Sequence, residues 1–196
     1  MDCMEALLGR RSCRNFKPDP IEKEKVLKML EAATYAPSPA HKQPWEFIVV
    51  NNLAYNKKIK EHGELVKAKV AERSGWTWLP SFNIDFLMQS PTMIVVLADP
   101  SKYGGEHFLD EPSPGYLEGC ACAVQNMMLA AHAQGLGTLW WSLFEKKDVR
   151  KIFGISEDKD PIGIVCVGYP QKLGNAPVRK SLEEKVKIKS EDVVIY

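Results

Sequence analysis

Residues 117–131 read LEGCACAVQNMMLAA, and the expected fold depends on this stretch more than on any other. Its apolar side chains recur at alternating steps of four and three residues, the spacing of one helix face: Leu117, Ala121, Val124, Met128 and Ala131. Neighbouring apolar residues widen this face until the helix is apolar on nearly every side. Such a helix is predicted to be central and buried, and Gly135 is the left-handed residue that ends it.

Working outward from this helix, apolar and β-branched runs predict buried strands at residues 47–50, 93–97, 138–141 and 162–167. Helical patterns are found between and before them, at residues 1–9, 20–36, 56–73 and 145–153. Residues 101–115 contain paired glycines and two prolines and are predicted to form a loop. The alternation of short buried strands with helices indicates a layered α/β or α+β sandwich.

The composition excludes several classes of protein. The 196 residues carry 26 Lys and Arg against 25 Asp and Glu, so the basic excess of a nucleic-acid-binding protein is missing. The most apolar long segment, residues 127–144, is interrupted by histidine, glutamine and glycines, which argues against a membrane span. Residues 1–11 contain no apolar signal sequence. The five cysteines are an odd number, and disulfide frameworks are typical of small secreted domains rather than of a chain of this kind. We expect one cytoplasmic domain over residues 1–196, with reduced thiols.

The first candidate site is the basic run Arg10-Arg11-Ser12-Cys13-Arg14. Guanidinium groups match phosphate oxygens bidentately, and the serine hydroxyl is a further donor. By composition alone, a solvated basic turn is the commoner explanation of such a run. The run is therefore either an anion site or an exposed turn.

Two further segments are candidates for holding a flat ligand. Residues 36–45, APSPAHKQPW, contain three prolines and are expected to be rigid and non-helical. They either present Ser38 and His41 to a ligand or connect two elements, with Trp45 filling the core. Residues 135–142, GLGTLWWS, suit either a flat pocket walled by aromatic rings or a helix cap followed by a core strand.

The sequence offers no support for metal or acid–base chemistry. Cys120 and Cys122 lie two positions apart on the predicted helix, about 200° apart around its axis, so they do not share one ion. Both are expected to be ordinary buried thiols. The four histidines are scattered, and no nucleophile elbow, phosphate loop or dinucleotide fingerprint is present. We expect neither a metal site nor a catalytic side chain.

Four short motifs follow one another along the chain. They are Arg10-Arg-Ser-x-Arg14-x-Phe16; Ala36-Pro-Ser followed by Gln43-Pro-Trp-x-Phe-Ile-Val49; Gln125-Asn-Met-x-Leu-Ala-Ala131 with Gly135-Leu-Gly-Thr138; and Gly168-Tyr-Pro170 with Arg179-Lys180. Each is weak alone, but together they run from residue 10 to about 180 and cover nearly the whole chain. In this order they resemble the FMN-dependent nitroreductase family.

The resemblance implies an α+β fold: a three-layer sandwich with a central mixed sheet flanked by helices. It also implies a homodimer with one FMN at each of two interface sites. Residues 181–196 would form a C-terminal extension exchanged onto the partner subunit. The apolar end Val193–Tyr196, which follows a charged stretch, fits that role because a terminal strand needs a sheet to join.

The resemblance also assigns cofactor-binding residues. The FMN phosphate and ribityl chain would be held by the basic groups and the hydroxyl of Arg10, Arg11, Ser12, Arg14, Arg179 and Lys180. The flavin ring would meet residues of the other subunit, namely Pro37, Ser38, Pro39 and His41, and would lie along Trp141, Ser142 and Leu143. Either Lys67 or Lys69 would approach its pyrimidine edge. Two positions depart from the family pattern: His41 replaces the usual Asn, and Ser142-Leu143 replaces the Glu-Gly of some members.

The expected function is an NAD(P)H-dependent FMN oxidoreductase, in which the flavin N5 carries the chemistry. The acceptor would be an electron-poor small molecule such as a nitroaromatic or a quinone. The alternatives are a specialised branch of the family, performing dehalogenation or flavin fragmentation, and a flavin-binding protein without general turnover. Trp76, Trp78 and Phe82 are expected either to form a lid over the ring or to be core or interface aromatics.

Overall fold

The computed structural model of the chain describes residues 1–186, so the strand expected at Val193–Tyr196 lies outside the described residues. The strands are β1 (Trp45–Val50), β2 (Thr92–Ala98), β3 (Gly137–Trp141) and β4 (Asp160–Gly168). The α-helices are α1 (Cys3–Gly9), α2 (Lys23–Thr34), α3 (Leu53–Ser74), α4 (Phe86–Gln89), α5 (Gly115–Ala133) and α6 (Lys146–Phe153). The 3-10 turns are η1 (Pro39–His41) and η2 (Gly105–Phe108).

The four strands form one sheet in the order β1-β2-β4-β3. Each neighbouring pair is antiparallel; in the central pair, for example, Val95 lies opposite Ile164. A mixed sheet was expected, but the one parallel pairing among residues 1–186 is the isolated bridge between Ser12 and Thr138. Strand direction depends on the path of the connections, which the apolar pattern of a strand does not report.

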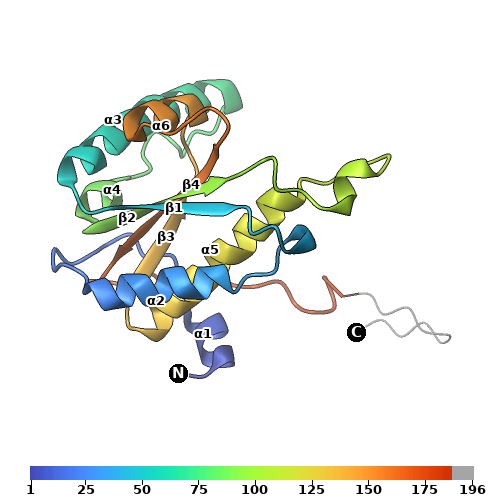
Figure 1. Cartoon of the computed structure of the whole chain (residues 1–196). Coiled ribbons are helices and arrows are strands. Elements are labelled where there is room, and N and C mark those ends of the chain that lie inside the picture. Colours follow the sequence, from blue (N-terminus) through green and yellow to red (C-terminus); the bar gives the residue numbers. More distant parts are fainter. Residues whose placement is uncertain (187–196) are drawn as a thin grey trace.

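Helices cover both faces of the sheet, so the fold has the three layers that were expected (Figure 1). Successive side chains of a strand point to opposite faces, and the central strand β2 is buried along its whole length. Its Ile94 and Val96 pack with α2 and α5, whereas its Met93 and Val95 pack with α3, α4 and α6. The two layers of helices thus share one buried strand.

Helix α5 is the central helix that the sequence predicted. Its Cys120, Val124 and Met127 are fully buried between α2 and the sheet, and the helix is followed by Gly135 with a positive φ of 77°. Cys122 is exposed, which corrects the expectation of two buried thiols. The reason is geometric: a residue two positions from a buried one lies on the opposite side of a helix.

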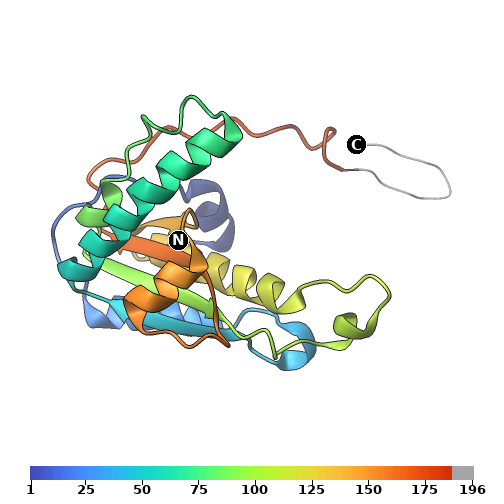
Figure 2. The same ribbon diagram turned by 90° about the horizontal axis from the view of Figure 1, so that it is seen from above.

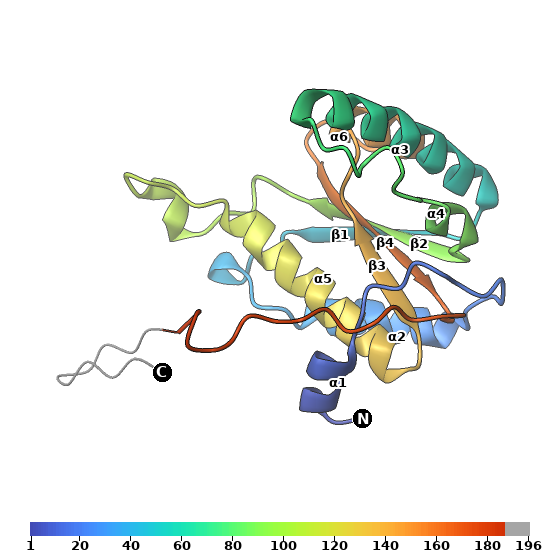
Figure 3. The same cartoon turned by 180° about the vertical axis from the view of Figure 1, so that it is seen from behind.

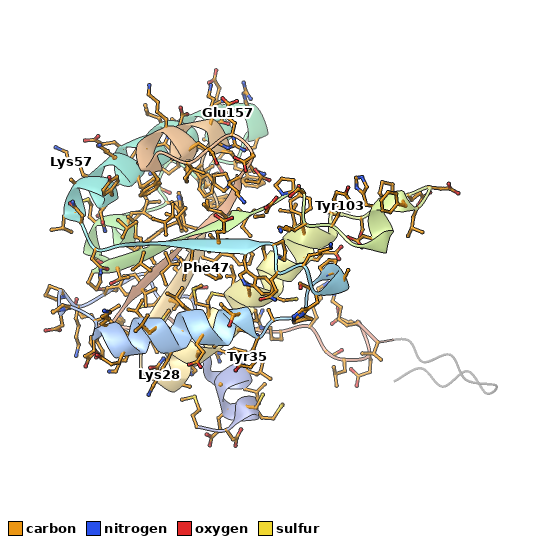
Figure 4. The ribbon with its side chains drawn as sticks, in the orientation of Figure 1. Lys28, Tyr35, Phe47, Lys57, Tyr103 and Glu157 are labelled. Carbon is orange, nitrogen blue, oxygen red and sulfur yellow. The ribbon has the colours of Figure 1, made fainter. Side chains whose placement is uncertain are left out.

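Strand β1 was expected to be covered on both faces, and this was wrong. It is an edge strand paired only with β2, and its burial is partial along most of its length. Phe47, which Figure 4 shows between the helical layers, is only half-buried, and Val49 is exposed. A run of four apolar residues does not distinguish a central strand from an edge strand.

The chain between β2 and α5 forms a projecting arm, residues 99–114, that carries η2 (Figures 1 and 2). Tyr103 stacks on His107 within it, with ring centroids 4.0 Å apart, and Phe108 is exposed. Within the arm, the Glu106 carboxylate accepts a hydrogen bond from Gly104 N at 2.8 Å, which stabilises the turn at η2. A loop was predicted here, and the short helical turn was not.

Candidate functional site

The N-terminal segment that carries the basic run is attached to the open edge of β3. Cys13 N donates to Thr138 O at 2.8 Å, and Ser12 forms the parallel bridge with Thr138. A second bridge joins Phe16 to Pro170, immediately after β4. Figure 3 shows the segment that follows β4 running along the same side of the molecule as this edge. The motif at residues 10–16 and the motif at 168–170 are therefore neighbours in space.

The arginine cradle is a cavity of about 290 Å³ between these two segments. It is lined by Arg10, Arg11, Ser12, Arg14, Gly174, Asn175, Pro177 and Arg179. Four of these residues carry a guanidinium group and none carries a carboxylate. The basic run thus lines a concave surface, although Ser12 and Arg14 are themselves exposed. An anion site at this cavity stays a prediction.

The electrostatics of the cradle favour an anion. The pKa of Arg10 is lowered by burial first, and then by the positive charges of Arg179 and Arg11. Burial first, and then the positive charges of Arg10 and Arg11, lower the pKa of His132 on α5. Like charges gathered without a counter-charge repel one another, and a bound phosphate removes that repulsion. Arg11 also donates to Leu8 O at 2.6 Å, which ties the cradle to the end of α1.

The aromatic slot is a second cavity, of about 250 Å³. It is lined by Arg14, Trp76, Trp78, Leu79, Phe82, Phe86, Leu139, Trp140, Trp141, Ser142 and Leu143. Arg14 lines both cavities, and its guanidinium lies 5.9 Å from the centre of the Phe82 ring. A phosphate in the cradle and a flat ring in the slot would therefore sit on either side of one arginine.

The outer wall of the slot is a pair of stacked indoles. The Trp76 and Trp78 rings are 5.6 Å apart and inclined by 23°, and about half of each side chain is exposed. Phe82 meets Trp78 edge-on at 5.8 Å. The two tryptophans are therefore not core residues, which leaves the lid and interface alternatives of the sequence analysis.

The inner wall of the slot is formed by β3, and three buried polar atoms of this strand lack a hydrogen-bond partner among the described residues: Thr138 Oγ1, Trp140 Nε1 and Trp141 Nε1. Thr138 does not line the slot, and the Trp140 side chain packs with the α2 and α5 layer, so only Trp141 Nε1 lies on the side of the slot. A buried donor left unpaired costs about 1–3 kcal/mol, so such atoms are rare and often mark functional sites. An unpaired indole N–H at Trp141, a basic cavity without a carboxylate and an adjoining aromatic slot together could hold a flat cofactor that ends in a phosphate.

The proline-rich segment does not line either cavity. Pro37, Ser38, Pro39 and His41 are absent from both walls. Their contact with the flavin of a partner subunit stays a prediction. The segment is rigid but strained: Ala40, His41 and Gln43 adopt positive φ angles of 45°, 56° and 47°. Ser38 Oγ accepts from Gln43 N at 3.1 Å, which holds the turn closed.

The structure also shows where the lysines expected near the flavin lie. Lys67 is buried, pairs with Glu64 at 2.6 Å and donates to Phe82 O at 2.9 Å, while Lys69 pairs with Glu145. Neither lysine lines the slot, and Lys180 lies outside the cradle, 3.6 Å from Glu184.

Several lining residues escaped the sequence analysis. Asn175 and Pro177 close the cradle, and Leu79 and Phe86 extend the slot. Asn175 and Pro177 lie in a stretch without a recognisable motif. The one signal in the sequence that could have identified them is their closeness to Arg179, which was expected to bind the phosphate. Burial raises the pKa of the Cys13 thiol, so this cysteine beside the arginines is not activated. Within residues 1–186 no cluster of potential metal ligands occurs.

Comparison with known proteins shows the family and the fold to which the chain is similar. The family model described as "Nitroreductase family" matches residues 7–169. A protein of Methanothermobacter thermautotrophicus, provisionally named an NADH dehydrogenase/NAD(P)H nitroreductase, is 32% identical over 178 residues, covering 87% of this chain and 78% of its own. A 5,6-dimethylbenzimidazole synthase of Rhodospirillum rubrum is 26% identical over 178 residues, covering 87% and 83%. The solved FMN-dependent nitroreductase of Clostridium difficile R20291 superimposes with a TM-score of 0.73 at 25% identity, covering 95% of this chain and 99% of that one.

The chain therefore belongs to the nitroreductase family. The resemblance read from the four motifs is confirmed, as is the three-layer α+β fold. No helix within residues 1–186 is both long and apolar enough to cross a bilayer.

Proposed function

We propose that this protein is an FMN oxidoreductase that takes hydride from NAD(P)H and reduces an electron-poor acceptor such as a nitroaromatic or a quinone. The observation that carries the proposal is the shared position of Arg14, between a cavity of guanidinium groups and a cavity of aromatic rings. FMN has this division, with a dianionic phosphate at one end and a flat ring at the other. The relative named an FMN-dependent nitroreductase supports the choice of cofactor.

In this proposal the arginine cradle binds the phosphate. Arg10, Arg14 and Arg179 supply charge-assisted hydrogen bonds, and Ser12 supplies a hydroxyl. Binding offsets the repulsion that lowers the pKa of Arg10. Lys180 is assigned a lesser part, in the approach of the phosphate, because it lies outside the cavity.

The aromatic slot orients the ring. Bound FMN supplies hydride chemistry at its N5, so the protein needs to bind, orient and tune it rather than provide a triad. Trp141 supports the ring, and Ser142 and Leu143 offer backbone N–H groups at the slot. The positive charge of Arg14 stabilises an anionic reduced ring. Lys67 and Lys69 act indirectly, through the bonds that they make to Phe82 and Glu145.

The acceptor would enter between the ring and the indole pair. Trp76 and Trp78 present flat, apolar faces that suit an aromatic acceptor, and no acidic side chain lines the slot. A neutral or anionic acceptor is therefore favoured over a cationic one.

The proposed assembly is a cytoplasmic homodimer over residues 1–196, treated as one domain. Pro37, Ser38, Pro39 and His41 of each subunit would meet the flavin of the other, and residues 181–196 would extend onto the partner. Shortening the chain after Asp192 should then lower both the dimer stability and the flavin content, because a ligand that binds only the dimer also stabilises it. Light scattering together with flavin absorbance measures both; a monomer that retains FMN at micromolar concentration would refute the shared site.

The direct test is spectroscopic. The purified protein should be yellow, with a band near ~450 nm, or should take up FMN on titration. NADH or NADPH should then bleach this band, and nitrofurazone or menadione should restore it. A protein that binds no FMN, or whose flavin neither nicotinamide reduces, would overturn the proposal.

A specialised branch is the second candidate. It is favoured by the 26% identity to a 5,6-dimethylbenzimidazole synthase over most of both chains. Flavin that is reduced by NAD(P)H but not reoxidised by either acceptor, and that is consumed in air, would support this candidate over a general reductase.

A further inference from the structure

The wall of the slot formed by Ser142 and Leu143 is held from behind by helix α3. The wall continues through Phe144 to Glu145, where α6 begins. Glu145 N donates to Nε2 of His62, on α3, at 3.0 Å. The His62 side chain is only 11% exposed, so this bond is largely shielded from water. It is a contact between residues 83 positions apart that fixes the end of the slot wall.

The direction of this bond defines the protonation state of His62. A ring nitrogen that accepts a hydrogen bond carries no proton, so the neutral tautomer has its proton on Nδ1. Nδ1 lies 3.8 Å from Oδ2 of Asp148, on the first turn of α6. Protonated histidine donates from both nitrogens, and Nε2 would then face the Glu145 N–H with like polarity.

Helix α3 contacts both walls of the slot through other residues as well. Lys67 donates to Phe82 O on the outer wall, and Lys69 pairs with the Glu145 carboxylate. Gly63 lies directly against the inner wall, since a methyl group on it would stand 3.5 Å from Cζ2 of Trp141. His62 therefore belongs to the element that sets the width of the slot.

We propose that His62 is a positioning residue for the flavin site: through its bond to Glu145 N it fixes residues 142–145 against the slot. The proposal rests on the proposed function, because it takes the slot as the flavin site. The charged groups placed around His62 are Asp148 and Glu145 from α6 and its N-cap, and Lys69 from α3, which is paired with Glu145. The expected consequence is a flavin site that loosens when the acceptor of the Glu145 N–H is removed.

Two substitutions separate the hydrogen bond from the bulk of the side chain. His62→Gln places an amide oxygen near the position of Nε2 and so keeps an acceptor, whereas His62→Leu removes the acceptor. At pH 8 the Gln variant should bind FMN within about twofold of the wild type, and the Leu variant roughly three- to tenfold more weakly.

The matched control is His107→Gln, on the projecting arm and outside both cavities. It should bind FMN with the affinity of the wild type. Equal FMN affinity in wild type, His62→Gln and His62→Leu would overturn the proposal.

A measurement without flavin distinguishes failure of this inference from failure of the proposed function. Hydrogen–deuterium exchange over residues 142–145 should be slow in the wild type and His62→Gln at pH 8 and faster in His62→Leu. Unchanged exchange in the Leu variant refutes the role of His62 even if FMN binds. Faster exchange in that variant, in a protein that takes up no FMN, supports the contact and refutes the proposed cofactor instead.

Discussion

A methyl group on Gly137 would stand 2.7 Å from Cβ of Cys13 and 2.9 Å from its Sγ. These two residues are where the N-terminal segment meets the edge of β3, next to the bond between Cys13 N and Thr138 O. The absence of a side chain at Gly137 thus allows the approach that brings Arg10 and Arg14 to the cradle. Gly137 belongs to the motif Gly135-Leu-Gly-Thr138, and its close contact with Cys13 explains why a glycine suits this position.

Gly137→Ala should therefore both destabilise the protein and weaken FMN binding. Overpacking at a buried contact costs about 1–3 kcal/mol, and relief requires the segment to move away from β3. Thermal unfolding and FMN titration measure the two effects. Gly105→Ala is the control, since nothing lies within 4 Å of the added methyl group. Adding Cys13→Gly should restore part of both losses; a double variant as poor as the single one would contradict this account.

Arg10→Ala should discriminate between FMN and riboflavin. Arg10 lines the cradle but not the slot, so it is expected to interact with the phosphate alone. A charge-assisted hydrogen bond contributes on the order of 1.5–3 kcal/mol, which predicts a roughly ten- to hundredfold loss for FMN and little change for riboflavin. Fluorescence titration of both flavins tests this, with Lys17→Ala as a neighbouring control outside the cavity. An equal loss for both flavins would show that Arg10 does not bind the phosphate.

Trp76→Ala should act on the acceptor rather than on the cofactor. Loss of one ring of the stacked pair removes an aromatic contact, so the KM for menadione should rise roughly three- to tenfold. FMN affinity should change less than twofold, because Trp76 is half exposed on the outer wall. Steady-state kinetics with Leu65→Ala, an exposed position on α3, provides the comparison. If the KM stays constant, the indole pair has no role in acceptor binding.

Asp99 should make the stability of the protein depend on pH in the acid range. Lys159 Nζ lies 2.8 Å from its Oδ2, and this contact, with bonds from Ser101, lowers the pKa of Asp99 to about 2. A carboxyl whose folded-state pKa lies below its ordinary value of 3.8 stabilises the fold above about pH 4, and this contribution is lost as the pH falls through about 2.

Asp99→Asn should accordingly cost about 1–3 kcal/mol at pH 7 and progressively less below pH 4. Thermal unfolding of both proteins at several pH values measures the difference. Asp110→Asn, on the exposed arm, controls for the general effect of removing a carboxylate. If the difference in stability between Asp99→Asn and the wild type is the same at every pH, the charge of Asp99 does not stabilise the fold through Lys159.

Much of this fold was readable from the sequence because it depends on local periodicity. The step of four and three residues through Val124 and Met128 predicted the central helix, and the short apolar runs predicted every strand. Strand order and direction depend on long-range pairing, so they were not readable. The edge position of β1 and the antiparallel sheet follow from that pairing and from no pattern within the strands.

The candidate site was readable only in part for the same reason. Arg10, Arg14 and Arg179 stood out by their chemistry, and the structure brings them together. The contact between His62 and Glu145 joins two elements without a motif, so it appears only in three dimensions. Residues that bind a ligand directly carry a chemical signature, whereas residues that hold them in place do not.

The cradle also has a consequence for the order of folding. Its walls come from residues 10–14 and 174–179, which are separated by about 160 residues of sequence. Closing so long a loop is entropically unfavourable until β3 and β4 are paired, because Ser12 bridges to Thr138 of β3, and Phe16 bridges to Pro170, which follows β4 and leads to residues 174–179. The phosphate site is therefore expected to mature late, after the sheet. A chain still emerging from the ribosome would have no place for the cofactor, so loading is expected to follow synthesis.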